Sequence, residues 1–302
     1  GRLVDGGRCA AREPHVSDYD TLFVDLDGVV YRGRQAVPHA VDALSTFPGR
    51  VLYVTNNASR TPQTVAAQLS GYGLPVSAAD VVTSAQAAAA HVATLVPAGA
   101  RILVTGGDGL VDAVVSHGLR VVTSADEADA VVQGYSPALA WKDLAEASYA
   151  VARGIPWVAS NTDMSVPTAR GIAPGNGTLV AAVSSATGRQ PVVTGKPHPP
   201  IMELARARAH SDRPLVVGDR LDTDIAAATA AGMDSLLVLT GVSGWHDLLE
   251  LPVADLPTRV APDLRVLSGY TDDATRLLEE LLAGLKSGAD VSPVVASLHQ
   301  LP

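Results

Sequence analysis

The sequence predicts an α/β protein built on a Rossmann-like, doubly wound parallel sheet. Short runs rich in Val, Ile and Leu alternate with longer Ala- and Leu-rich stretches along most of the chain. This alternation is typical of parallel strands joined by crossover helices. Several of the short runs are almost continuously apolar, as expected of strands that are buried on both faces. Hydrophobic residues make up 47% of the 302 residues, which is enough for a sizeable core.

The individual elements follow from these runs. We expect strands at residues 21–24, 51–55, 81–83, 102–105, 130–133, 157–160, 215–217 and 235–239. We expect helices at residues 36–45, 61–69, 84–95, 140–152, 177–186, 223–231 and 272–286. Pro62 stands at a first-turn position, which a helix tolerates well. The tail that begins at Ser287 is expected to be loosely ordered.

Composition excludes several classes of function. The chain carries 22 Lys and Arg against 31 Asp and Glu, a net charge of −9. Nucleic-acid binding depends on basic contacts to phosphates and on aromatic stacking, and only 4% of the residues are aromatic. The eight His residues show none of the spacings of a zinc site. We therefore expect no nucleic-acid partner and no zinc centre.

The sequence also bears on location. Cys9 is the single cysteine, so no disulfide can form within the chain. No apolar run approaches the ~18–20 residues of a membrane helix, and residues 1–14 lack the continuous apolar stretch of a signal peptide. We expect a cytoplasmic protein without a membrane partner.

Two carboxylates follow the first predicted strand. Asp25 and Asp27 come directly after the apolar run 21–24, and Gly28 follows them. Sheets of this class bind their ligands at the carboxyl ends of the strands. Two like charges this close are costly without a cation, so the pair indicates a functional site more than a turn.

Polar groups suited to an oxyanion follow the second strand and recur late in the chain. Thr55, Asn56 and Asn57 form a hydroxyl- and amide-rich turn before a predicted helix. Lys196 stands between Gly195 and a proline, and a lysine is a compact positive charge that suits phosphate. Taken alone, the first is also compatible with an ordinary helix N-cap and the second with a turn that carries an exposed lysine.

A second acidic group follows the strand at 215–217. Asp219, Asp222 and Asp224 lie within six residues and have one arginine, Arg220, among them. A hard divalent cation is the simplest counter-charge for such a group.

Together these pieces form an ordered set that resembles the haloacid dehalogenase-like (HAD) hydrolases. The set is strand-DxDG, strand-Thr, Lys and strand-GDxxxxD. The chain is most similar to the phosphatases of subfamily IIA, which act on glycerol phosphate, phosphoglycolate, pyridoxal phosphate or p-nitrophenyl phosphate. The motifs that carry this likeness are at residues 55–60, 160–163, 174–177, 195–197 and 218–225. They extend over most of the chain, from about residue 20 to residue 244.

The resemblance implies a HAD core interrupted by a smaller α/β cap. The long separation of Thr55 from Lys196 leaves room for such an insertion. Breaks in the pattern at 97–100 and 188–191 mark its candidate edges. We therefore expect a core of residues 1–97 and 191–302 and a cap of residues 98–190.

The resemblance also implies a role for each site residue. Asp25 would be the nucleophile that takes the phosphoryl group, and Asp27 the general acid and base. The expected Mg²⁺ ligands are Asp25, the backbone carbonyl of Asp27, and Asp219. The expected phosphate-binding residues are Thr55, Asn56, Asn57 and Lys196, with Asp222 and Asp224 orienting Lys196 or metal-bound water.

The expected activity is Mg²⁺-dependent hydrolysis of small phosphomonoesters, with glycerol 3-phosphate or 2-phosphoglycolate as the preferred candidates. Val166 precedes Pro167 where pyridoxal phosphate phosphatases carry His, which disfavours pyridoxal phosphate as the substrate. The same motifs are also compatible with a sugar phosphomutase and with an inactive ligand-binding HAD fold. Residues 161–176 would fold over the mouth of the site and enclose a small metabolite. A homodimer through the cap is a further expectation that rests on the resemblance alone.

Overall fold

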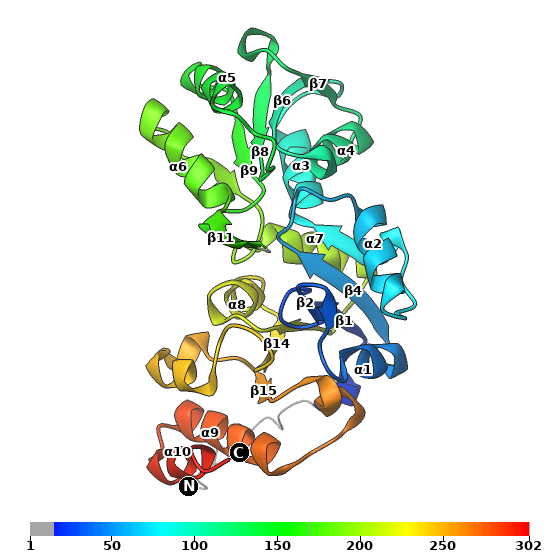
Figure 1. Ribbon diagram of the computed structural model, residues 1–302, viewed down its shortest axis with the longest axis vertical. Helices are drawn as coiled ribbons and strands as arrows, with labels where there is room; N and C mark the ends of the chain where they lie inside the picture. Colours follow the sequence, from blue (N-terminus) through cyan, green and yellow to red (C-terminus); the bar gives the residue numbers. More distant parts are fainter. Residues whose placement is uncertain (1–14, 169, 302) are drawn as a thin grey trace, which may run out of the picture.

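The computed structural model describes residues 15–168 and 170–301. Cys9 and the rest of residues 1–14, on which the expectations about disulfides and signal peptides bear, lie outside the described residues. The described chain forms two parallel sheets, one above the other along the long axis of the molecule (Figure 1). This arrangement confirms the predicted α/β class.

The first sheet has six parallel strands in the order β15-β14-β13-β1-β4-β5. Their bounds are β1 Thr21–Val24, β4 Arg50–Thr55, β5 Val81–Thr83, β13 Pro214–Gly218, β14 Asp234–Val238 and β15 Arg259–Ala261. Because β1 is followed in space by β4 on one side and by β13 on the other, the strand order reverses at β1. A parallel sheet of this kind binds its ligand at such a switch point.

Side chains alternate across this sheet and fill two hydrophobic layers. Leu22 and Val24 of β1 pack on one face with α1 (Ala40–Thr46) and α2 (Pro62–Gly71). Phe23 packs on the other face with α7 (Pro200–Ala209) and α8 (Ala226–Ala230). The period of two along β1 therefore explains why this strand is buried on both sides.

The second sheet has five parallel strands in the order β12-β9-β8-β6-β7. Their bounds are β6 Arg101–Thr105, β7 Arg120–Val122, β8 Ala130–Gln133, β9 Trp157–Ala159 and β12 Val192–Val193. Helices α5 (Trp141–Ala152) and α6 (Asn176–Thr187) cover one face, and α3 (Ser84–Leu95) and α4 (Asp108–Ser116) cover the other (Figure 1).

Helix α3 joins the two parts of the molecule. Its Ala85, Ala88 and Val92 pack into the hydrophobic cluster of the second sheet, whereas its Ala87 packs into a cluster of the first. We propose the division into a core of residues 1–97 and 191–302 and a cap of residues 98–190. In that division α3 is the element through which the cap rests on the core.

Two short antiparallel hairpins flank the sheets, and the sequence pattern predicted neither. One is β2 (Tyr31–Arg32) with β3 (Gln35–Ala36), and the other is β10 (Ser165–Thr168) with β11 (Gly171–Pro174). The helix expected at 36–45 therefore begins at Ala40, since Ala36 pairs with Tyr31 across the first hairpin. A similar shift occurs at 223–231, where a wide π-type turn over Leu221–Ile225 precedes α8.

The expectation of a loosely ordered tail is wrong. After α9 (Asp273–Ser287) the chain forms a further helix, α10 (Ser292–Leu298). Val294, Val295 and Leu298 recur at helical spacing and pack into a cluster with Leu278 and Leu281 of α9. This apolar spacing is visible in the sequence and could have predicted the helix.

Within the described residues, no helix is both long and apolar enough to cross a membrane.

The packing of β1 gives a stability prediction. Phe23 is fully buried at the centre of the first sheet, so Phe23→Ala should lower the free energy of unfolding by about 3–5 kcal/mol through lost burial and a residual cavity. Val115→Ala, on the exposed side of α4, is the control and should change it by less than about 0.5 kcal/mol. Urea unfolding followed by circular dichroism measures both. Equal effects of the two substitutions would contradict this account of the core.

Candidate active site

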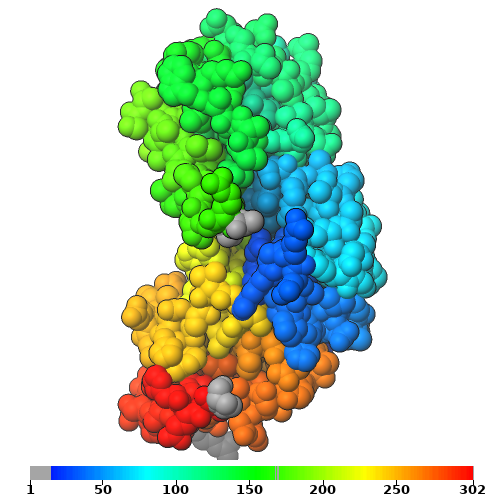
Figure 2. Space-filling model, viewed as in Figure 1, coloured from blue at the N-terminus to red at the C-terminus, as the bar shows by residue number. Residues whose placement is uncertain are grey.

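A cavity of about 570 Å³ lies at the carboxyl ends of β1, β4 and β13. Asp25, Asn56 and Asp219 each follow one of these strands and line it. The opposite wall includes Tyr135 and Asp163, which follow strands β8 and β9 of the second sheet. In Figure 2 the molecule narrows at this level, where the green segment of the upper part meets blue and yellow segments of the lower part.

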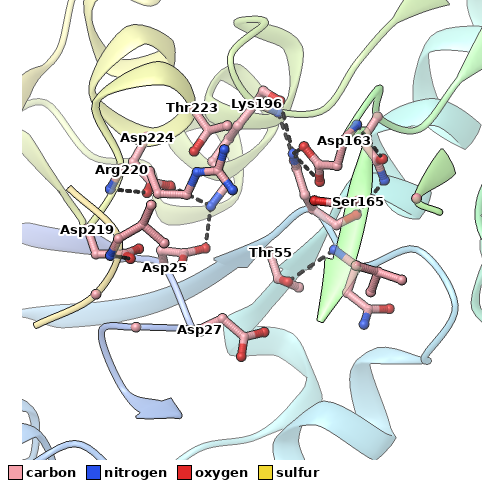
Figure 3. Close-up of a pocket in the computed structure, with 18 of the residues that line it drawn as sticks. Asp25, Asp27, Thr55, Asp163, Ser165, Lys196, Asp219, Arg220, Thr223 and Asp224 are labelled. Atoms are coloured by element: carbon pink, nitrogen blue, oxygen red, sulfur yellow. Dashed lines mark hydrogen bonds and ion pairs between the residues drawn. The ribbon is translucent and has the colours of Figure 1, made fainter. Parts of the chain in front are cut away.

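Lys196 is the buried positive charge of the site. Its side chain is 3% exposed, and its ammonium contacts the Asp25 carboxylate. It also donates to Asp224 Oδ1 at 2.7 Å and to the Val54 carbonyl oxygen at 3.1 Å (Figure 3). Burial by itself would lower the pKa of Lys196, but the charges and hydrogen bonds of Asp224 and Asp25 raise it above its ordinary value. The lysine is therefore held in its charged form.

For Asp25, in contrast to Lys196, burial outweighs the charge of the partner in its effect on the pKa. Burial raises the pKa of its carboxyl well above the ordinary value, the charge of Lys196 lowers it, and the nearby Asp224 and Asp219 raise it further. One ammonium thus faces three carboxylates. The cluster carries an excess of negative charge that a cation would neutralise.

Asp219 is fixed in a close-fitting recess. The backbone N–H of Val242 donates to its Oδ2 at 2.8 Å. A Cβ on Gly28 or on Gly241 would overlap its carboxylate, so both positions need glycine. Its Oδ1 is buried and, among the described residues, has no hydrogen-bond partner. Burial, followed by the charge of Asp224, raises the pKa of Asp219 to about 6.

These observations fit a hard divalent cation. Asp25, Asp219 and Asp224 each offer a carboxylate oxygen, and these atoms all lie within 4.8 Å of one another. Buried polar atoms are rarely left without a partner, and the free Oδ1 of Asp219 gives a cation a ready ligand. Carboxylate oxygens are the ligands that Mg²⁺ and Ca²⁺ prefer.

Asp27 lies on another side of the cavity, apart from this cluster (Figure 3). Burial raises the pKa of its carboxyl, and the charges of Arg60 and Lys196 partly offset this effect. Arg60 in turn donates to the Tyr31 hydroxyl at 3.1 Å. A carboxyl with a raised pKa is suited to carry a proton to or from a bound ligand.

The turn after β4 presents donors to the same cavity. Thr55 Oγ1 accepts the Asn57 N–H at 3.1 Å, which leaves its hydroxyl proton free to donate. Asn57 Oδ1 accepts both the N–H and the hydroxyl of Ser59, at 2.9 and 2.8 Å. These local bonds shape the turn, as Asn side chains commonly do.

Asp222 is not brought together with the other expected residues. Its side chain is 68% exposed and pairs with Arg220 at 2.7 Å, and it is not among the residues that line the cavity. Asp224, by contrast, points inward to Lys196 and accepts the Arg220 N–H at 3.2 Å. The wide turn over Leu221–Ile225 separates the two carboxylates in this way.

Several residues line the cavity to which the motif analysis gave no role. They include Arg32 in β2 of the first hairpin, Tyr135 after β8, and Ser165 in β10. Residues of the segment 161–176 also line it, Val166 among them, as we expected for the mouth of the site. Tyr135 could have been predicted from the sequence, because it is a polar residue shortly after the expected strand at 130–133. No local pattern singles out Arg32.

Comparison with known proteins identifies the family. A model described as haloacid dehalogenase-like hydrolase matches residues 22–120, and a HAD-hydrolase-like model matches residues 193–267. D-glycerol 3-phosphate phosphatase of Mycobacterium tuberculosis is 50% identical over 252 residues, which cover 83% of this chain and 71% of that protein. The chain belongs to the haloacid dehalogenase-like hydrolases.

Other relatives of this hydrolase are also phosphatases. Acid sugar phosphatase of Staphylococcus saprophyticus is 36% identical, over 82% of this chain and 96% of that protein. The crystal structure of the M. tuberculosis glycerol phosphate phosphatase with magnesium matches with a TM-score of 0.82 and 46% identity, over 89% of this chain and 81% of that one. The p-nitrophenyl phosphatase of Archaeoglobus fulgidus matches with a TM-score of 0.77 and 30% identity, over 85% and 100% of the two chains. This hydrolase is a phosphatase, as the sequence predicts.

The recess around Asp219 gives a prediction. Gly241→Ala should weaken divalent-cation binding by the hydrolase, because the new methyl group overlaps the Asp219 carboxylate and must displace it. Titration calorimetry with Mg²⁺ measures the effect. Gly71→Ala, at the end of α2 with open space around the new Cβ, is the matched control and should leave cation binding unchanged. Equal affinities in the two variants would show that Asp219 does not hold the cation.

Proposed function

We propose that this phosphatase hydrolyses small phosphomonoesters with Mg²⁺ through an aspartyl phosphate on Asp25. The observation that carries the proposal is the buried contact of Asp25 with Lys196 at the switch point of the sheet. The preferred substrate is glycerol 3-phosphate, followed by 2-phosphoglycolate. The 50% identity to a D-glycerol 3-phosphate phosphatase supports this order.

In the proposed reaction an Asp25 oxygen attacks phosphorus as the ester P–O bond breaks. Asp27 gives its proton to the departing alkoxide, which leaves as an alcohol. Asp27 then accepts a proton from water, and the resulting hydroxide attacks the phosphoryl group on Asp25. The acyl phosphate P–O bond breaks, phosphate leaves and the Asp25 carboxylate is restored. The raised pKa of Asp27 is consistent with both proton transfers.

Binding of the phosphate is assigned to residues around Asp25. The Thr55 hydroxyl, the Asn56 backbone N–H and the side-chain amide of Asn57 would donate to phosphate oxygens, since the Asn57 backbone N–H already donates to Thr55 Oγ1. Lys196 would neutralise charge on Asp25 and phosphate. Bound Mg²⁺, held by Asp25, Asp219 and the Asp27 carbonyl oxygen, would supply further charge neutralisation between carboxylate and phosphate. Asp224 orients Lys196.

The cavity favours a small substrate. Its volume of about 570 Å³, bounded by the core on one side and by residues 161–176 on the other, suits a metabolite better than a phosphoprotein. Val166 lines it with an aliphatic side chain at the position where pyridoxal phosphate phosphatases carry His, which disfavours pyridoxal phosphate as the substrate. We place the enzyme in the cytoplasm, where such metabolites are made; the single cysteine of the sequence is consistent with a reducing compartment.

The first experiment tests the nucleophile and ranks the substrates. Phosphate release is measured with glycerol 3-phosphate, 2-phosphoglycolate, pyridoxal 5′-phosphate, p-nitrophenyl phosphate, a hexose phosphate and a nucleoside monophosphate, each with Mg²⁺ or with EDTA. We expect release only with Mg²⁺, fastest with glycerol 3-phosphate, and at least a ~10³-fold loss of kcat in Asp25→Asn. Asp126→Asn, an exposed acid in the cap, is the control and should retain full activity.

The same panel distinguishes a phosphatase from a mutase and from a binding protein. Rearranged sugar phosphate with little free phosphate would indicate a phosphomutase. Metal-dependent ligand binding without turnover would indicate an inactive fold. Full activity in Asp25→Asn would refute the proposed nucleophile.

We also propose that two copies associate through their caps. Trp141 and Tyr149 stand on one side of α5 and are 78% and 58% exposed, an apolar surface that pairing would cover. Light scattering after gel filtration should give the mass of a dimer, and the double substitution Trp141→Glu and Tyr149→Glu should give that of a monomer. A natural protein that is already a monomer at micromolar concentration would contradict the proposed dimer.

A further inference from the structure

The side chain of Asn56 is committed to the main chain of Lys196, 140 residues further along the sequence. Asn56 Oδ1 accepts the Lys196 N–H at 2.8 Å, and Asn56 Nδ2 donates to the Lys196 carbonyl oxygen at 2.9 Å. A carboxamide that pairs with both polar groups of one residue restricts the rotation of that residue as well as its position. Asn56 therefore holds Lys196 by its backbone.

The same carboxamide reaches the cap. Asn56 Nδ2 lies 3.2 and 3.3 Å from the two carboxylate oxygens of Asp163. An amide nitrogen has two protons, and Lys196 and Asp163 account for both. The side chain thus retains no N–H for a substrate, although it stands at the wall of the cavity.

The backbone of Asn56 is anchored from two further directions. Its carbonyl oxygen accepts the Ser84 hydroxyl at 2.6 Å and Asn161 Nδ2 at 2.8 Å. Ser84 is the fully buried first residue of α3, and Asn161 follows β9 of the second sheet. Asn56 is consequently bonded to the core, to the cap and to the lysine segment at once.

The space around this contact is closed. A Cβ on Gly195 would lie 2.7 Å from Asn56 Oδ1 and would overlap the Ser160 carbonyl oxygen. Gly195 therefore lets the chain that carries Lys196 pass between Asn56 and the cap. Because the fit is close, a displacement of Asn56 or Ser160 would shift the segment that carries Lys196.

The position of the Lys196 main chain decides where its ammonium stands. The ammonium has three protons and three acceptors, namely Asp25, Asp224 and the Val54 carbonyl oxygen. A displacement of about 1 Å at a catalytic group can cost ~10²-fold in rate. Lys196 must therefore be held at its backbone as well as at its charged end.

We propose that the Asn56 side chain is a positioning residue that holds Lys196 against Asp25 and joins it to Asp163 of the cap. This inference rests on the proposed function, since it assigns Asn56 a part in the phosphatase reaction. It differs from the phosphate contact expected of the Asn56 backbone N–H, because the carboxamide touches Lys196 and not the substrate. Its removal should lower kcat and leave KM nearly unchanged.

The kinetic test swaps the side chains of Asn56 and Asp163 in two steps. Asn56→Asp keeps an acceptor for the Lys196 N–H but loses both donated bonds and places a second carboxylate beside Asp163. Its kcat should fall by ~10²-fold. Adding Asp163→Asn supplies an amide that donates to the new carboxylate, so the double variant should recover part of the loss. A loss confined to KM, or a double variant that is no better than Asn56→Asp, would overturn the proposal.

A second measurement does not depend on turnover. Hydrogen exchange of the Lys196 N–H, resolved by NMR, should be faster in Asn56→Ala than in the natural protein and nearly natural in Asn56→Asp. Asn57→Ala, which removes side-chain bonds to Ser59 and no bond to Lys196, is the matched control and should leave this exchange rate unchanged. Slow hydrogen exchange of N–H groups in the strands of the first sheet verifies that each variant is folded.

The two measurements separate failure of the inference from failure of the proposed function. If the natural protein releases no phosphate from any compound, the proposed function fails, and faster exchange at Lys196 in Asn56→Ala still supports the positioning contact. If the natural protein is active and this exchange rate is unchanged in Asn56→Ala, the proposed function stands and the positioning role is refuted.

Discussion

One buried ammonium brings the parts of this molecule together. Lys196 is almost completely enclosed, and a buried charge without partners would cost several kcal/mol. Its partners follow or belong to three strands of the first sheet: Asp25 after β1, Val54 in β4 and Asp224 beyond β13. These segments and the loop of Lys196 must meet at one point for the lysine to be tolerated. The same meeting point creates the acidic cluster that fits a cation.

The charge balance of this cluster links structure to chemistry. Asp25, Asp219 and Asp224 exceed the one ammonium in charge, and burial raises the pKa of Asp25 and Asp219. A cation would remove this penalty, and its binding would release any protons that the carboxylates hold. The free Oδ1 of Asp219, the recess formed by Gly28 and Gly241, and the fixed Val242 N–H together prepare the position. Such preparation limits reorganisation when a charged substrate arrives.

The proposed cap contributes hydrogen bonds to the site as well as one wall of the cavity. Its Asn161 and Asp163 donate to or accept from Asn56, which follows β4 of the first sheet and also bonds to Lys196. Helix α3 packs against both sheets and so connects the two parts. In the proposed reaction, enclosure of the substrate and placement of Lys196 would depend on the same small group of contacts. A substitution at Asn161 or Asp163 would then alter the reacting centre without touching the substrate.

The sequence alone predicted the fold class, most strands and a set of acidic and basic site residues, all of which except Asp222 the structure brings to the cavity. Continuous Val, Ile and Leu runs are a local signal of strands buried on both faces, and carboxylates directly after such runs indicate a site because parallel strands end at one edge. The short hairpins were not predicted, since Tyr31 and Ala36 pair through backbone bonds that leave no pattern in so few residues. The order of the tail was missed although its apolar spacing was present.

Only the tertiary structure decided which of these residues meet. Asp222 and Asp224 belong to the same acidic group and stand two residues apart, yet the wide turn directs one to solvent and the other to Lys196. Asn56 has the pattern of an ordinary polar turn residue, and only the fold brings its carboxamide against Lys196, 140 residues away. Arg32 and Tyr135 line the cavity from separate parts of the chain. Such long-range contacts are set by the packing of α3 and of the two sheets, which no local pattern encodes.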